Sequence, residues 1–151
     1  MMKTLVAYFS KTGRTKKAAE QIAEIINCED LYEIKTEKVY PKNYFMTLIA
    51  ARREFSNNEQ PVLISEPIKN FDEYERILIG FPVWFWTCPM AIISFLKTYD
   101  FSGKNIYPFC TSGSTGCERA KIAIEKNCAG KVFDGIKANK IDREKILDWL
   151  K

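Results

Sequence analysis

The stretch that decides the fold is TLVAYFSKTGRT, residues 4–15, in which a short apolar run ends in a loop of hydroxyl and basic residues. Residues 4–9 are apolar or β-prone on both faces, which is typical of a central parallel strand. A helix is predicted over residues 13–27, because apolar residues recur at three- and four-residue spacing from Ala18 to Ile26. A strand followed by such a loop and a helix is the opening unit of an α/β fold.

The rest of the chain continues this alternation. Further strands are predicted at residues 31–34, 76–81, 104–110 and 131–133, and further helices at residues 44–55, 89–99, 115–127 and 142–150. Thr115 and Glu118 have the spacing of a capping box, and Asp142 is expected to cap the last helix. Residues 62–64 are a candidate edge strand within a segment, residues 35–75, whose pattern is the least readable. The order predicts a parallel sheet with right-handed crossovers in a single domain, residues 1–151.

The composition narrows the class of protein. The chain has 151 residues, of which 46% are hydrophobic and 28% are charged, so it is expected to bury a core without a structural metal or disulfide. It contains no histidine, which excludes Ser-His-Asp and Cys-His catalysis and zinc sites that use histidine. The net charge of +4 is not gathered into a basic tract, so nucleic acid is not an expected partner.

The cysteines and the start of the chain predict a cytoplasmic protein. The five cysteines form no CxxC motif, and we expect ordinary thiols in a reducing cytosol. The chain begins without a signal-peptide pattern and has no apolar run of the ~20 residues that span a bilayer. Membrane insertion is therefore not expected.

Three loops are expected at the carboxyl edge of the sheet, where open parallel sheets bind ligands. Residues 10–15 offer hydroxyls, a glycine and a helix start, which suit a phosphate as well as a simple helix cap. Residues 82–89, PVWFWTCP, form either a satellite core or a stacking surface for a flat ligand. Residues 111–116 are small and leave their backbone open to a ligand, or form an ordinary loop. Together they predict one site for a ligand with a phosphate tail and a flat heterocyclic head.

These motifs resemble those of the flavodoxin family. SKTGRT, residues 10–15, is similar to the flavodoxin phosphate-loop pattern S/T-x-T-G-x-T directly after the first strand. Residues 80–86 resemble the loop whose aromatic covers one flavin face, and residues 109–114 resemble the loop along the other edge of the ring. The resemblance is poorest over residues 35–75. It implies a short-chain, flavodoxin-like, doubly wound sheet of five parallel strands in the order 2-1-3-4-5, in three α/β/α layers, with FMN bound noncovalently.

The resemblance also implies roles for individual residues. The first loop would hold the phosphate. Trp84 would stack on the flavin, with Phe85 and Trp86 excluding water. The third loop would contact the edge of the isoalloxazine. The cofactor-binding residues implied are Ser10, Lys11, Thr12, Gly13, Arg14, Thr15, Pro82, Val83, Trp84, Phe85, Trp86, Thr111, Ser112, Gly113 and Ser114. The flavin itself carries the redox chemistry, so no catalytic acid, base or metal is expected.

The charge of the chain departs from the family pattern, because electron-carrier flavodoxins are acidic. Residues 11–17 contain four cations and no acid, which form either a solvated helix start or a rim that attracts an anionic substrate or acidic partner. The predicted function is electron transfer through FMN to a redox partner protein or small-molecule acceptor. The alternative is an NAD(P)H-dependent quinone- or nitro-reductase. A non-redox nucleotide-binding module or a signalling receiver is more remote, and the receiver lacks an acid between Met1 and Arg14.

Overall fold

The structure, a computed structural model, describes residues 2–113 and 115–151. Its strands are β1 (Thr4–Tyr8), β2 (Leu31–Glu33), β3 (Arg76–Pro82), β4 (Asn105–Thr111), β5 (Lys131–Val132) and β6 (Ile136–Lys137). Its helices are α1 (Arg14–Ile25), α2 (Tyr44–Ser56), the 3₁₀ turn η1 (Phe71–Glu73), α3 (Met90–Thr98), α4 (Glu118–Asn127) and α5 (Arg143–Trp149). Strands and helices alternate along most of the chain, as the sequence predicts.

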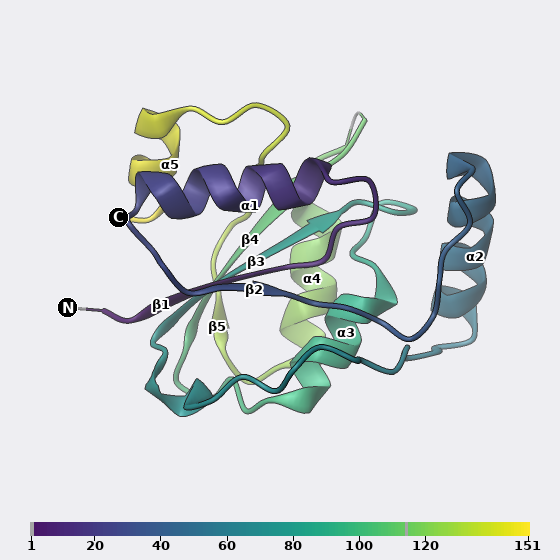
Figure 1. Ribbon diagram of the computed structural model, residues 1–151, viewed down its shortest axis with the longest axis horizontal. Coiled ribbons are helices and arrows are strands. Elements are labelled where there is room, and N and C mark those ends of the chain that lie inside the picture. The colour runs from purple at the N-terminus through teal and green to yellow at the C-terminus, as the bar shows by residue number, and fades with distance from the viewer. Residues whose placement is uncertain (1, 114) are drawn as a thin grey trace.

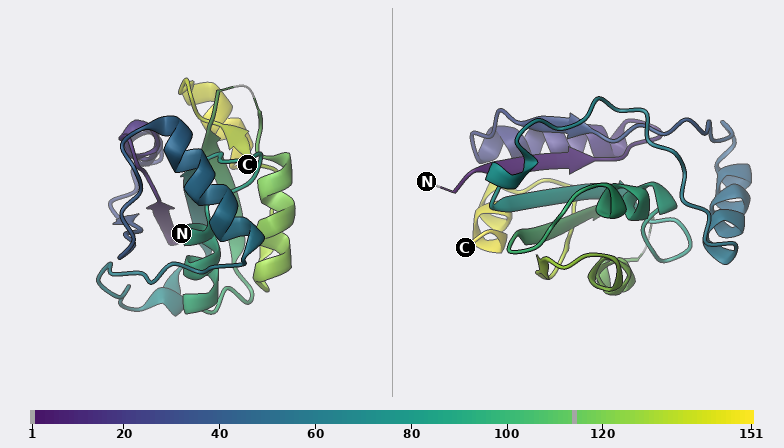
Figure 2. Two further views of the ribbon diagram at one scale, coloured as in Figure 1. Left: turned by 90° about the vertical axis from the view of Figure 1, so that its right-hand side faces the viewer. Right: turned by 90° about the horizontal axis from the view of Figure 1, so that it is seen from below.

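The sheet is parallel and runs in the order β2-β1-β3-β4-β5, so the predicted strand order is confirmed. Helices α1 and α5 cover one face, and α3 and α4 cover the other (Figures 1 and 2). Alternate residues of β1 are buried on opposite sides: Val6 and Tyr8 pack in the cluster beneath α1, whereas Leu5 and Ala7 pack in the cluster beneath α3 and α4. Burial on both faces explains why this strand is apolar throughout.

The edge strand beyond β4 is interrupted, which the sequence did not predict. β5 pairs with the amino-terminal part of β4, and β6 pairs with its carboxyl-terminal part. The carbonyls of Ile106 and Cys110 accept hydrogen bonds from residues after β5 and β6, so Pro108, which alternates with them, also turns its backbone toward this edge. Proline lacks an amide donor, and the interruption falls where that donor is missing.

Three local predictions need correction. Glu118 begins α4, but the N-cap is Cys117 and not Thr115, and no side chain of the described residues caps the helix, so the capping box is wrong. Residues 62–64 form only one isolated bridge, between Leu63 and Thr36, in place of an edge strand. Pro89 is the N-cap of α3 and not its first helical residue. The predicted cap at Asp142 is confirmed, because its side chain accepts from the amides of Glu144 (3.0 Å) and Lys145 (3.4 Å).

Helix α2 stands apart from the layers, beyond the carboxyl ends of the strands (Figure 1). This helix confirms the prediction of a helix at residues 44–55. It packs chiefly against α3, and much of its surface is exposed. Within the described part of the chain, every helix is too short or too polar to cross a membrane. The loops at the carboxyl ends of the strands and the start of α2 line a common cavity.

Candidate functional site

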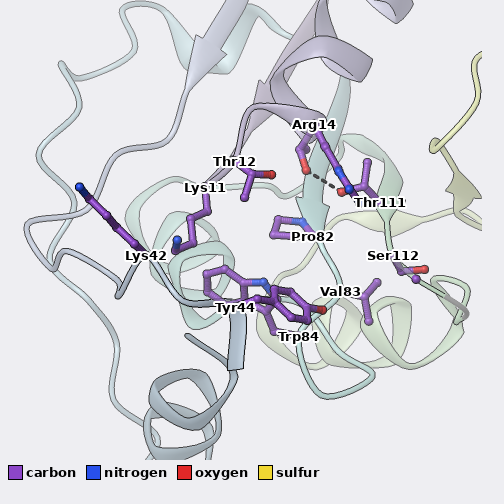
Figure 3. A pocket seen from close by; sticks show the side chains of 12 residues that line it. Lys11, Thr12, Arg14, Lys42, Tyr44, Pro82, Val83, Trp84, Thr111 and Ser112 are labelled. Carbon is purple, nitrogen blue, oxygen red and sulfur yellow. Dashed lines mark hydrogen bonds between the residues drawn. The ribbon is translucent and has the colours of Figure 1, made fainter. Parts of the chain in front are cut away.

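A cavity of about 420 Å³ opens at the carboxyl ends of β1, β3 and β4 (Figure 3). We call it the site cavity. It is lined by Lys11, Thr12, Arg14, Thr15, Lys42, Tyr44, Pro82, Val83, Trp84, Thr111, Ser112 and Gly113. The structure therefore brings together parts of all three predicted loops, and adds two residues that precede and begin α2.

The first loop turns the start of α1 toward the cavity. Gly13 is the N-cap, and its φ of 95° is a left-handed conformation that glycine adopts without strain. The Gly13 amide donates to Ser10 Oγ (3.1 Å), so Ser10 shapes the loop and does not itself line the cavity. Among the residues that the structure describes, no side chain caps α1, and its first turn contains no acid. The first amides of the helix are therefore left as donors for an anion.

The first and third loops are joined by a buried hydroxyl pair. Thr15 Oγ1 and Thr111 Oγ1 lie 2.8 Å apart, and either can be the donor (Figure 3). Thr15 is buried at the start of α1, and Thr111 ends β4. This bond links the two loops through two predicted binding residues, and it gives the donating hydroxyl a partner inside the protein.

The third loop is held from a distance by a residue that the sequence analysis missed. The Ser112 amide donates to Asn139 Oδ1 (2.9 Å), and Asn139 Nδ2 donates back to the Ser112 carbonyl. Ser112 Oγ donates to the carbonyl of Thr115. These bonds occupy the polar groups of Ser112. Gly113 also lines the cavity and has open space beside its Cα, so its backbone can approach a ligand. The predicted site residue Ser114 lies outside the described residues.

Trp84 forms part of the opposite wall and is also a core residue. Its side chain is only 3% exposed, and its ring lies 5.7 Å from that of Phe9 and 5.0 Å from that of Tyr40, both edge to face. The sequence left open whether this tryptophan belongs to a satellite core or to a stacking surface. In the structure, Phe9 and Tyr40 already cover much of the ring, as the satellite-core alternative expects.

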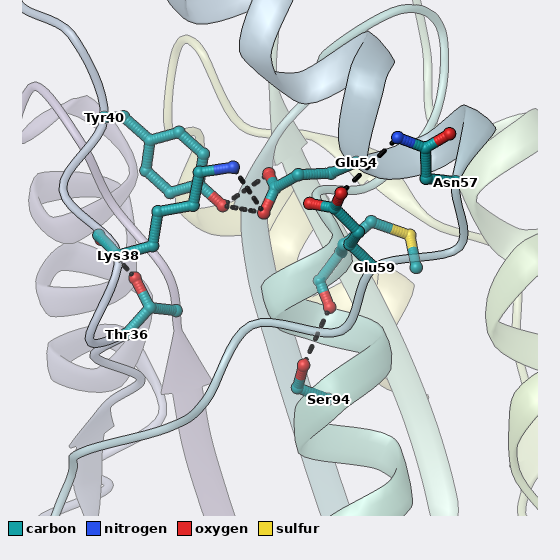
Figure 4. Close-up of polar contacts among 8 residues, drawn as sticks. Thr36, Lys38, Tyr40, Glu54, Asn57, Glu59 and Ser94 are labelled. Atoms are coloured by element: carbon teal, nitrogen blue, oxygen red, sulfur yellow. Dashed lines mark hydrogen bonds and ion pairs between the residues drawn. The ribbon is translucent and has the colours of Figure 1, made fainter.

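Tyr40, which packs against Trp84, is held by the buried Glu54, and Glu54 pairs with the partly exposed Lys38 (Figure 4). Tyr40 Oη donates to Glu54 Oε1 (2.7 Å), and Lys38 Nζ lies 3.3 Å from Glu54 Oε2. Burial, together with the neighbouring carboxylate, raises the pKa of Tyr40 far above its usual value. The phenol therefore remains a neutral donor, and the Glu54 carboxylate is paired although its residue is buried. This contact joins α2 to the wall of the site cavity.

The remaining predicted aromatics point elsewhere. The Trp84 amide donates to the Thr87 carbonyl (3.0 Å), and the Thr87 amide donates back (3.3 Å), which closes a two-residue turn. Phe85 and Trp86 both have positive φ, 52° and 66°, as in a type I′ turn. Such values are strained for bulky residues. Phe85 and Trp86 line a separate groove on the other side of this turn, and neither lines the site cavity.

Two of the five cysteines are bonded, which corrects the prediction that all are thiols. Cys110 in β4 and Cys117 at the N-cap of α4 form a disulfide with a Cα–Cα distance of 6.1 Å. It closes the loop that contains residues 111–113 of the site cavity. Cys28, Cys88 and Cys128 are free, and burial raises the pKa of Cys88 to about 12, so it stays a thiol at neutral pH. The described residues contain no cluster suited to a metal ion.

Lys42 and Tyr44 are the lining residues that sequence reasoning missed. They lie in the least readable segment, although Asn43 gives a local signal: its side chain accepts from the Met46 amide (3.3 Å) and caps α2. That signal predicts a helix start. It does not predict that the start faces the phosphate-type loop, because this placement depends on contacts between distant parts of the chain.

Comparisons with known proteins agree with this architecture. The profile of the family described as Flavodoxin matches residues 3–151. A protein from Bacteroides uniformis assigned as a flavoprotein is 33% identical, with a TM-score of 0.83 over 99% of this chain and 97% of that one. A similarly assigned protein from Bacteroides eggerthii is 29% identical, with a TM-score of 0.87 over 99% and 96%.

A third similar structure was solved with a cofactor. It is a flavoprotein from Lactobacillus acidophilus in complex with FMN, 26% identical, with a TM-score of 0.78 and full coverage of both chains. No curated protein matches the chain.

Proposed function

The chain belongs to the flavodoxin family, and we propose that it binds FMN noncovalently in the site cavity and transfers electrons through it. One observation carries the proposal: the uncapped start of α1 opens into a cavity whose opposite wall is aromatic and apolar. A ligand with an anionic end and a flat end fits these two chemistries. The FMN complex of the similar Lactobacillus acidophilus flavoprotein supports the choice of ligand.

The residues present suit the phosphate of FMN. Lys11, Arg14 and Lys42 line the cavity, and none of its described lining residues is acidic. The first amides of α1 and the Thr12 hydroxyl supply neutral donors beside these cations, the combination that favours a phosphate dianion. Ser10 and Gly13 shape the loop that presents these groups.

The other wall suits the ring system. Pro82, Val83, Trp84 and Tyr44 offer apolar surface that would withdraw the isoalloxazine from water. Gly13 and Gly113 leave open space beside their Cα atoms, so the backbone can approach a ligand. When bound, FMN would supply the electron transfer itself, while these residues bind it, orient it and exclude water. The electron partner would be a redox protein or a small-molecule acceptor.

A valine at position 12 tests the phosphate assignment. Thr12→Val removes a hydroxyl at an exposed position and keeps the shape of the side chain, so the domain should remain folded. A hydrogen bond to a charged group contributes about 1.5–3 kcal/mol, and FMN affinity should fall roughly ten- to a hundredfold. Thr12→Ser, which keeps the hydroxyl, should bind nearly as well as the parent. Equal FMN dissociation constants for all three proteins would remove Thr12 from the site.

An NAD(P)H-dependent reductase is the second candidate, and the charge of the chain favours it. Arg14, Lys16 and Lys17 are exposed at the start of α1, and the chain carries a net charge of +4. Such a rim attracts anionic donors or acidic partners. Rapid anaerobic mixing of the FMN-loaded protein with NADPH separates the two functions: fast loss of the flavin absorbance supports the reductase, and no reaction supports the carrier.

A further inference from the structure

A second concave surface lies on the other side of the turn at residues 84–87. It is a groove of about 650 Å³ lined by residues of α2, of α4 and of the turn. Figure 2 shows α2 lying across the carboxyl end of the sheet, with α4 beside the sheet. We call it the basic groove. Its described lining residues are Arg52, Phe55, Ser56, Phe85, Trp86, Thr87, Arg119, Ile122, Ala123, Lys126 and Asn127. The turn forms a wall of both hollows, since Trp84 faces the site cavity and the next two aromatics face the groove.

The charge of the groove is of one sign. Arg52, Arg119 and Lys126 line it, and no carboxylate does so among the described residues. None of the ion pairs found in the described part of the chain involves these three cations. Arg119 also stands in the first turn of α4, where a cation is unfavourable against the helix dipole. The groove therefore holds three cations without an ion-pair partner among the described residues, although Glu118 stands beside Arg119 in the same turn.

The two guanidinium groups are already placed on aromatic rings. Arg52 Cζ lies 5.7 Å from the Phe85 ring centre, and Arg119 Cζ lies 5.8 Å from that of Trp86. These cation–π contacts hold both guanidinium groups at the groove. The ring of Trp86 is 54% exposed although burial of tryptophan is favourable, and the backbone that presents it is in the left-handed region. Strain of this kind is concentrated at binding sites.

We propose that the basic groove binds a planar ligand that carries phosphate, of the nucleotide class. The exposed indole offers a stacking face for the base, and the arginine forks match the geometry of phosphate oxygens. The volume lies within the ~300–1,000 Å³ that is usual for small-molecule sites. Binding itself is independent of FMN, whereas a role for the ligand as electron donor rests on the proposed function.

The same observations disfavour a second copy of the chain as occupant. A twofold contact brings the same patch of both copies together, so Arg52 and Arg119 of one copy would meet the like charges of the other. The groove contains no acid to offset that repulsion among its described residues. An acidic segment of another protein matches the charge but not the concave shape, and it becomes one outcome of the test.

The experiment measures ADP binding by calorimetry and by quenching of tryptophan fluorescence. ADP should bind, whereas adenosine and inorganic phosphate, which each lack one half of the ligand, should bind at least about tenfold more weakly. Arg52→Ala and Arg119→Ala should each lower ADP affinity by about tenfold. Arg53→Ala is the matched control, because it removes the same charge from the same helix without lining the groove.

Further variants locate the ligand and separate the two proposals. Trp86→Phe should remove most of the fluorescence quenching, and Thr12→Val should leave ADP affinity unchanged while FMN affinity falls. No ADP binding, or ADP binding that is insensitive to Arg52 and Arg119, overturns the proposal. So does loss of ADP binding in Thr12→Val alone, which would place ADP in the site cavity, or binding of a hexaglutamate peptide with none of ADP. The arginine variants should bind FMN as tightly as the parent does. No FMN binding by the parent would count against the proposed function only, whereas a fall in FMN affinity in the arginine variants would place these residues in the FMN site and overturn the separate groove.

Discussion

Replacing Trp84 with alanine is expected to lower the free energy of unfolding of the FMN-free protein by about 3–5 kcal/mol. The indole is 3% exposed and packs edge to face against Phe9 and Tyr40. Its loss leaves a void behind the turn and removes aromatic contacts that the protein has even without a ligand. Urea unfolding of the FMN-free forms measures the effect.

Trp86→Ala is the matched control for this prediction, because it deletes the same side chain two residues later where the ring is 54% exposed. Its effect on unfolding should be several times smaller. If both variants lose equally little stability while Trp84→Ala alone loses FMN affinity, the Trp84 ring packs against the cofactor and not against protein. That result would contradict the core role that we assign to it.

Loss of the Cys110–Cys117 bond is expected to lower the free energy of unfolding by about 2–3 kcal/mol, the entropy that closing a short loop removes from the unfolded chain. The bond joins residues seven positions apart. Cys117→Ser should therefore unfold at lower urea concentration than the parent, and a reducing agent should affect the parent but not this variant.

Cys128→Ser is the control for the disulfide, because Cys128 is a free and partly buried thiol. It should unfold in the same range as the parent and keep its sensitivity to reduction. Alkylation of the unreduced, denatured parent should label Cys28, Cys88 and Cys128 and leave the other two unlabelled. Labelling of all five cysteines would show that the bond does not form in solution.

The fold was predictable because its signals are local. The apolar run at residues 4–9, the hydroxyl-rich loop after it and the spaced apolar residues of α1 each report on their own segment, and the strand order follows from the family resemblance that they carry. The interrupted edge strand was not predictable. It depends on which edge of β4 the backbone of Pro108 faces, and on which later residues pair with β4 at that edge.

The candidate site was predictable only in part. The three loops do line one cavity, yet Lys42, Tyr44 and Asn139 contribute from segments without a recognisable pattern. Phe85 and Trp86 were placed with Trp84 because they are adjacent in sequence, and a tight turn separates them. The cysteine pair was missed because its spacing resembles no known motif and becomes meaningful only when β4 and α4 come together.

The most direct test of the central claim is titration of the flavin-free protein with FMN and, separately, with riboflavin, which has the same ring system and no phosphate. We predict that FMN binds with quenching of its fluorescence, and that riboflavin binds at least about tenfold more weakly, because it lacks the charged hydrogen bonds at the start of α1. Equal affinity for the two flavins, or no binding of FMN, would contradict the account.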